Sequence, residues 1–112
     1  MDDGSSEKVY TQIATLEIDP SQLDAYYAAV SAQAKAAIAN EPGVLALNAV
    51  ADRTNPARIT VFEIYRNRAA YESHLQAAHF LHYKATVENM VRSLMLSPVD
   101  PVVLAAKSET PG

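Results

Sequence analysis

The sequence predicts an α+β domain of the ferredoxin-like type, in which the order β-α-β-β-α-β forms an antiparallel sheet with its helices on one face. Residues 9–18 and 44–66 alternate as strands do, and the segments 19–40 and 68–94 repeat apolar residues at helical spacing. With 112 residues the chain can form one hydrophobic core and not two. We expect residues 9–105 to form the domain, residues 1–8 a disordered lead-in and residues 106–112 a C-terminal tail.

The first strand is followed by a helix. Between Val9 and Ile18 apolar residues occupy both alternating faces, as expected if one face meets helices and the other meets a second sheet. Asp19-Pro20-Ser21-Gln22 has the pattern of a helix start, because the aspartate can cap it, the proline suits the first helical position and the glutamine can reach back. Asn40-Glu41-Pro42-Gly43 is expected to end this helix.

A β-hairpin and a second helical region are expected to follow. The hairpin strands are predicted at 44–51 and 58–66, with a turn over 52–56. Helices are predicted over 68–77 and 78–94, as two helices or as one with a kink. The apolar stripe of the second helix would consist of Phe80, Tyr83 or Lys84, Val87, Val91, and Leu94 or Met95. The segment 97–101 contains two prolines and breaks the pattern, and Val102–Ala105 is predicted to form a short final strand.

The predicted sheet carries helices on only one face, so its other face needs a cover. Apolar residues are available in the hairpin strands, namely Val44, Leu47, Ile59 and Val61. A second copy of the chain is the simplest cover for such a face. We therefore expect a homodimer in which the open faces of two sheets pack together.

Composition and charge disfavour several classes of function. The net charge is −4 without a basic cluster, which argues against nucleic acids and anionic membranes as partners. The chain has no cysteine, so disulfides, thiolate metal sites and cysteine nucleophiles are excluded. It has three glycines and no GxGxxG motif, which argues against a dinucleotide cofactor. Because no apolar run reaches membrane-spanning length and the start is polar and acidic, we expect a cytoplasmic protein.

An acid and a histidine are the first candidate functional residues. Glu63 shares a strand face with apolar residues, and a buried carboxylate needs a partner, which could be Arg58, Arg66 or a residue of a second subunit. His74 lies on a helix that must cover the sheet, so its ring is expected to face inward or to line a pocket. It is either a neutral ring bonded to a backbone carbonyl or to Glu63, or a general acid/base.

Aromatic residues and the remaining histidines supply further candidates. Several tyrosines lie on elements that would line a cavity between sheet and helices, where they either pack in the core or orient an electron-rich phenolic substrate; they are Tyr26, Tyr27, Tyr65 and Tyr71. The three histidines do not predict a metal site. His74 and His79 are not at helical ligand spacing, and no acid lies near His79 and His82 in the sequence.

A group of these residues occurs at a characteristic spacing. The group consists of Glu41-Pro42-Gly43, Glu63 and Tyr65, Ala69, Tyr71, His74-Leu75 and His79-Phe80. In this spacing the chain resembles the antibiotic biosynthesis monooxygenase family, over about residues 9–105. The resemblance implies a dimeric α+β barrel. The same scaffold carries quinol or polyketide oxygenation, haem degradation and sugar-phosphate isomerisation, so the fold alone does not decide the reaction.

We expect a cofactor-independent monooxygenase that acts on a quinol or polycyclic phenol and molecular oxygen. The anion of such a substrate can itself give an electron to oxygen, so a base and a dry pocket suffice without a metal or flavin. The expected catalytic residues are His74, Glu63 and Tyr65, and the expected substrate-binding residues are Tyr26, Tyr71, His79 and Phe80. Haem degradation is disfavoured, because the chain has no tryptophan and Gln12 is the nearest amide where that branch has an asparagine. The alternatives are an isomerase or lyase of a small oxygenated metabolite, with His74 as the acid/base, and a non-catalytic dimeric ligand-binding domain.

Overall fold

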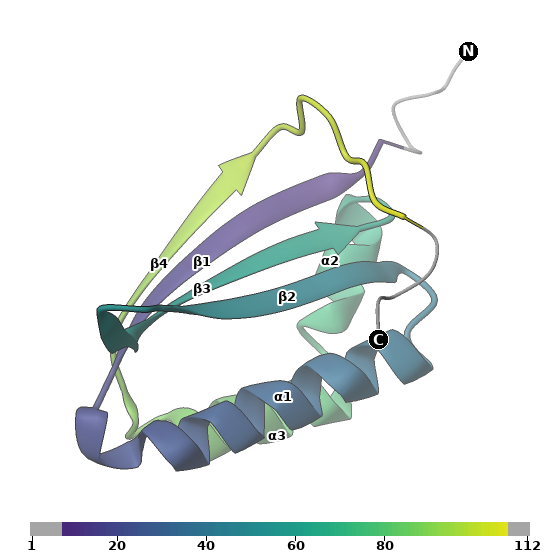
Figure 1. Ribbon diagram of the computed structural model, residues 1–112. Helices are drawn as coiled ribbons and strands as arrows, with labels where there is room; N and C mark the ends of the chain where they lie inside the picture. Colours follow the sequence, from purple (N-terminus) through teal and green to yellow (C-terminus); the bar gives the residue numbers. More distant parts are fainter. Residues whose placement is uncertain (1–7, 108–112) are drawn as a thin grey trace.

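The computed structural model describes residues 8–107 and has the predicted ferredoxin-like architecture (Figure 1). Its elements are β1 (Tyr10–Ile18), a short 3-10 turn (Pro20–Gln22), α1 (Leu23–Asn40), β2 (Val44–Asp52), β3 (Asn55–Tyr65), α2 (Arg68–His74), α3 (Ala78–Val87) and β4 (Val91–Val99). The four strands form one antiparallel sheet in the order β2-β3-β1-β4. The expected lead-in and tail fall almost entirely outside the described residues. No helix within residues 8–107 is long and apolar enough to cross a membrane.

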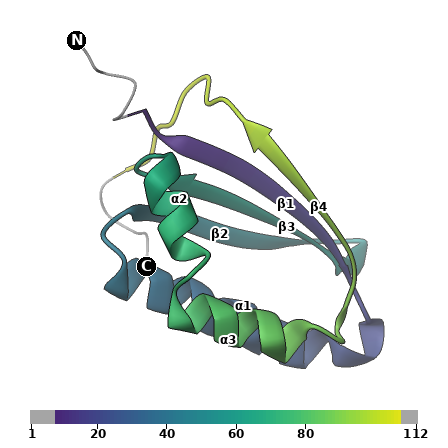
Figure 2. The same ribbon diagram turned by 180° about the vertical axis from the view of Figure 1, so that it is seen from behind.

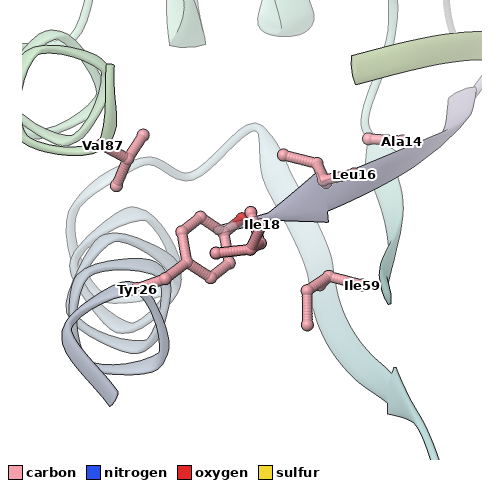
Figure 3. Packing of buried hydrophobic residues seen from close by; sticks show 6 residues of the cluster. All are labelled: Ala14, Leu16, Ile18, Tyr26, Ile59 and Val87. Carbon is pink, nitrogen blue, oxygen red and sulfur yellow. The ribbon is translucent and has the colours of Figure 1, made fainter. Parts of the chain in front are cut away.

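One face of the sheet carries all the helices. α1 and α3 lie side by side beneath it, and α2 stands near the ends of β2 and β3 (Figure 2). β1 pairs with β3, and on the helix-covered face Gln12 lies opposite Glu63 and Ala14 lies opposite Val61. The main core forms where this face meets α1 and α3, as Figure 3 shows, and consists of Ala14, Leu16, Ile18, Tyr26, Ile59 and Val87. The polar pair therefore lies on the same covered face as the core, farther along the strands.

The other face of the sheet has no covering element among the described residues. Leu47, Ile59 and Val61 were expected on this open face, but they lie on the other one. Leu47 and Val61 line a cavity on the helix side of the sheet, and Ile59 is in the core. Alternation along β1 and β3 places Ile13, opposite Phe62, on the open face. Val50 and Met95 are 62% and 66% exposed there. The open face is thus apolar, but it is built from residues other than those expected.

The last strand corrects the sequence prediction. The helix predicted to reach residue 94 ends at Val87, and β4 begins at Val91. Spacing such as Val87, Val91 and Leu94 fits a helix, but Leu94 and Leu96 also fit one face of a strand, and pairing with residues 11–18 of β1 decides for the strand. Pro98 is tolerated because β4 is an edge strand. The predicted strand at 102–105 is wrong, since those residues are in no strand.

A tight contact fixes α2 against the start of β2. Asn67 caps α2 by accepting a hydrogen bond from the backbone N–H of Ala70 at 2.9 Å. A side chain on Gly43 would place its Cβ 2.6 Å from the Cβ of Ala70, so only glycine fits at this position. The backbone N–H of Arg66 also donates to the Gly43 carbonyl at 2.8 Å. These contacts hold the C-terminal end of α1 beside α2, where the polar residues described next converge.

Candidate active site

A cavity of about 760 Å³ lies between the helix face of the sheet and the three helices. Its size suits a small organic ligand. Most of its wall is apolar, and polar groups gather at one end, where Gln12, Glu63, Tyr65, Tyr71 and His74 line it. Leucines of α3 and β4 that are about half exposed also line the cavity, namely Leu81, Leu94 and Leu96. The mouth therefore opens between α3 and the edge strand β4.

Glu63 is held by two donors inside this cavity. Its Oε1 accepts hydrogen bonds from Gln12 Nε2 at 3.1 Å and from the Tyr65 hydroxyl at 2.8 Å. Burial raises the pKa of Glu63 above its ordinary value, and these two hydrogen bonds oppose the rise only in part. Burial and the adjacent carboxylate also raise the pKa of Tyr65, which therefore stays protonated as a donor.

The prediction that Arg58 or Arg66 pairs with Glu63 is wrong. Arg58 lies 3.6 Å from Glu17. Arg66 donates to the Pro42 carbonyl at 3.1 Å. Both arginines are exposed, and neither is paired with Glu63. The partners are instead Gln12, which is directly opposite Glu63 on the neighbouring strand, and Tyr65, which is two residues along the same face of β3.

His74 is the most buried histidine and lines the cavity, with 1% of its surface exposed. Its Nδ1 lies 2.8 Å from Glu41 Oε2, so Glu41 takes the place of the backbone carbonyl or Glu63 that was expected as its partner. The ring packs between Phe80 and Tyr65, with centroid distances of 4.8 and 5.5 Å. Because a carboxylate only accepts, Nδ1 carries the proton when the ring is neutral and Nε2 keeps a lone pair. Within residues 8–107, the one side-chain hydrogen bond of His74 is the one between Nδ1 and Glu41.

Glu41 is the functional candidate that sequence reasoning missed as a partner. It follows the last residue of α1, and its Oε2 also lies 2.5 Å from Nε2 of His79. Glu41, His74 and His79 therefore form a cluster whose ligand atoms all lie within 4.8 Å of one another. The only signal for it in the sequence was its place in the Glu41-Pro42-Gly43 motif. The argument against a metal site used the lack of an acid near the histidines in the sequence, whereas Glu41, 33 residues from His74, reaches the histidines only through the fold.

The remaining candidates divide between wall and core. Tyr71 and Phe80 line the cavity as expected, and the Tyr71 ring stacks on Tyr10 at 4.7 Å. Tyr26 is fully buried in the core, where its hydroxyl is hydrogen-bonded to the Tyr83 hydroxyl at 2.8 Å. Of these two tyrosines, Tyr83 lines the cavity and Tyr26 does not. His79 contacts Glu41 and is not part of the cavity wall.

Comparison with known proteins supports this picture at the level of the family. The family model for antibiotic biosynthesis monooxygenases matches residues 9–86. The crystal structure of a protein from Bacteroides thetaiotaomicron VPI-5482, described by that family name, is 35% identical and superposes with a TM-score of 0.86. This match covers 93% of the present chain and 99% of the other. No match to the chain was found among curated proteins.

More distant structures share the fold alone. A Caulobacter crescentus CB15 protein is 21% identical with a TM-score of 0.81, over 88% of this chain and 94% of that one. A Pseudomonas aeruginosa protein is 24% identical with a TM-score of 0.79, over 89% of this chain and all of the other. Together, the family match and the 35% identical structure establish that this chain belongs to the antibiotic biosynthesis monooxygenase family.

Proposed function

We propose that the chain is a cofactor-independent monooxygenase that oxidises a quinol or polycyclic phenol in the cavity, with His74 as the base. The observation that carries this proposal is the pair formed by Glu41 and His74. The carboxylate orients the ring from outside the cavity, and the ring reaches the cavity wall with Nε2 free of any described donor. A histidine whose tautomer is set by a carboxylate on one nitrogen is prepared to take a proton on the other.

The chemistry balances with oxygen as the only oxidant. Nε2 of His74 removes the phenolic proton, and the resulting phenolate transfers one electron to O₂, giving an aryloxyl radical and superoxide. Their recombination forms a carbon–oxygen bond. The peroxide anion takes the proton back from His74, and the hydroperoxide loses water together with the hydrogen on the same ring carbon to leave a quinone. One oxygen atom enters the product, the other leaves as water, and the substrate supplies all four electrons that reduce O₂. An apolar wall favours this sequence, because it excludes bulk water from the radical pair and the peroxide.

Other residues of the cavity suit such a substrate. Tyr71, Phe80 and Tyr83 offer aromatic surface against which fused rings can stack. Gln33 of α1 also lines the cavity, and its Oε1 is the one buried side-chain polar atom without a hydrogen-bond partner in the described part of the chain. A substrate hydroxyl is a suitable donor for that oxygen. The Tyr65 hydroxyl already donates a hydrogen bond to Glu63, so we assign Tyr65 the role of fixing that carboxylate beside the reacting ring.

A comparison of two histidine variants tests the proposal. Oxygen uptake is measured with a panel of quinols and polycyclic phenols, using protein freed of metal and flavin. His74→Gln keeps a hydrogen-bonding group near Glu41 but cannot take up a proton near neutral pH, so turnover should fall at least ~100-fold. His82→Gln is the matched control, because His82 is exposed on α3 and belongs to neither the cavity nor the cluster. Undiminished oxygen uptake by His74→Gln would remove His74 from the mechanism.

One observation favours a second candidate, an isomerase or lyase of a small oxygenated metabolite. Glu63 uses only Oε1 for its hydrogen bonds to Gln12 and Tyr65, and both Glu63 and His74 line the cavity. Two acid/base groups on one cavity can remove a proton from one carbon and return it to another. Such a reaction runs without oxygen, so turnover under anaerobic conditions with exchange of solvent deuterium into the product would favour it over oxygenation.

Assembly and location complete the proposal. We assign the open sheet face, which carries Ile13, Phe62, Val50 and Met95, to the contact between two copies in a homodimer. The apolar character of this face and its lack of cover within residues 8–107 support that role. A cytoplasmic location and a small aromatic substrate with oxygen, rather than nucleic acid or membrane, are part of the same proposal and agree with the net charge of −4.

A further inference from the structure

We propose that Glu41, His74 and His79 form a binding site for a divalent first-row transition metal ion of the Zn²⁺ type. Three separate segments supply these residues: the end of α1, the last turn of α2 and the first turn of α3. Each offers one ligand atom, and the three atoms lie within 4.8 Å of one another. Two imidazoles and one carboxylate are a donor set that suits such ions. The folding of the domain therefore assembles a ligand set that is scattered along the sequence.

The distances leave little rearrangement to be made. Glu41 Oε2 lies 2.8 Å from His74 Nδ1 and 2.5 Å from His79 Nε2. Two ligand atoms on a tetrahedral ion at about 2.0–2.1 Å are about 3.3 Å apart, so the oxygen must separate from each nitrogen by less than about 1 Å. The two nitrogens, which lie within 4.8 Å of each other, must approach by at most about 1.5 Å. Rotation of the Glu41 and His79 side chains can supply this, because 16% and 23% of their surfaces are exposed. His74 is fixed by packing against Phe80 and Tyr65.

Charge and burial favour a cation here. Among the described residues, the ion pairs of Glu41 involve His74 and His79, and no lysine or arginine is paired with its carboxylate. The side chain of His74 is only 2% exposed, which keeps one side of the cluster away from bulk water. A partly sheltered carboxylate with two nitrogen donors and no fixed cation attracts a metal ion more strongly than exposed groups do.

The position of the cluster indicates a role other than binding the substrate. Glu41 and His79 are not part of the cavity wall, and the ion would lie on the Nδ1 side of His74, which faces Glu41. Its remaining ligands would therefore be water. An ion on Nδ1 leaves the proton of the neutral ring on Nε2, so Nε2 changes from acceptor to donor. This consequence, which rests on the proposed function, means that the metal and base catalysis by His74 exclude each other.

Titration of tag-free, metal-free protein with Co²⁺ tests the site directly. Co²⁺ bound to nitrogen and oxygen ligands absorbs visible light, and displacement by Zn²⁺ removes that absorption. We expect one equivalent per chain, with at least ~10-fold weaker binding in Glu41→Gln and in His79→Gln. His82→Gln is the matched control and should bind as the wild type does, because His82 lies outside the cluster. Melting curves without metal establish that the variants fold.

The outcomes separate the site from the reaction. Absence of stoichiometric Co²⁺ binding, or equal binding by the wild type, Glu41→Gln and His79→Gln, would overturn the proposal and leave the cluster as a hydrogen-bonded group. Loss of binding in His82→Gln alone would do the same. Where an oxidised substrate has been found, Zn²⁺ should suppress oxygen uptake and a chelator should restore it. Stoichiometric binding without suppression would keep the metal site and refute His74 as the base.

Discussion

Replacing Tyr65 with phenylalanine removes one buried hydroxyl and leaves the shape of the side chain nearly unchanged. Tyr65 is 1% exposed, and its hydroxyl donates to Glu63 Oε1 at 2.8 Å. The variant leaves Gln12 Nε2, at 3.1 Å, as the remaining donor to that oxygen. The change therefore isolates one hydrogen bond to a buried carboxylate, with no cavity of consequence in the surrounding core.

The cost should depend on pH. Burial raises the pKa of Glu63, and the Tyr65 hydrogen bond opposes that rise, so the variant raises this pKa further. When the pKa of a carboxyl group is higher in the folded than in the unfolded state, the free energy of unfolding is highest below the unfolded pKa. It decreases as pH rises through the folded pKa, because the folded state then has to bury a charged carboxylate. Above the folded pKa of Glu63 the lost hydrogen bond involves a charged group, so the cost should rise with pH to about 1.5–3 kcal/mol. At pH 4 the carboxyl is neutral, and the cost should fall to about 1 kcal/mol.

Tyr26→Phe provides the matched control. Tyr26 is fully buried, and its hydroxyl pairs with the hydroxyl of Tyr83 at 2.8 Å, which is neutral at both pH values. Its loss should cost about 1 kcal/mol at pH 4 and at pH 7.5 alike. Urea unfolding of the wild type and both variants, at one fixed protein concentration, gives the free energies. An equal cost at both pH values for Tyr65→Phe would refute the account of Glu63 as a buried carboxylate held by Tyr65.

Three further predictions follow from the fold and the composition. Gly43→Ala should lower the free energy of unfolding by about 1–3 kcal/mol, because the new Cβ would lie 2.6 Å from the Cβ of Ala70. In urea titrations, adding Ala70→Gly to this variant should restore part of the lost stability. Simple additivity of the two substitutions would contradict the clash. Light scattering at micromolar concentration should detect a dimer in the wild type and a monomer in Phe62→Lys, and a stable wild-type monomer would end the dimer proposal. Haem should bind weakly if at all and should not be degraded, because the chain has no tryptophan and carries Gln12 in place of the asparagine of the haem-degrading branch; a tight histidine-ligated spectrum that is lost when reductant is added would contradict this.

The local elements could be predicted because the interactions that define them span only a few residues. Asp19 accepts from the Ser21 backbone N–H at 3.0 Å and from Gln22 Nε2 at 3.2 Å, so the predicted cap is confirmed, although it begins a short 3-10 turn and α1 follows from Leu23. β4 could not be predicted in this way. Val91–Val99 fits two periodicities, and the choice between them came from pairing with β1, which is some eighty residues away.

Sequence by itself determined the fold class, through alternation, helical spacing and caps, and it marked Glu63, Tyr65 and His74 as unusual for their surroundings. Only tertiary structure decided which groups these residues meet. Gln12 reaches Glu63 through strand pairing across 51 residues, and Glu41 reaches His74 through the packing of α2 against the end of α1. Hydrogen bonds and metal ligation act within about 3 Å, whereas local sequence patterns report only on residues a few positions apart. The polar clusters therefore became visible only once the chain had folded.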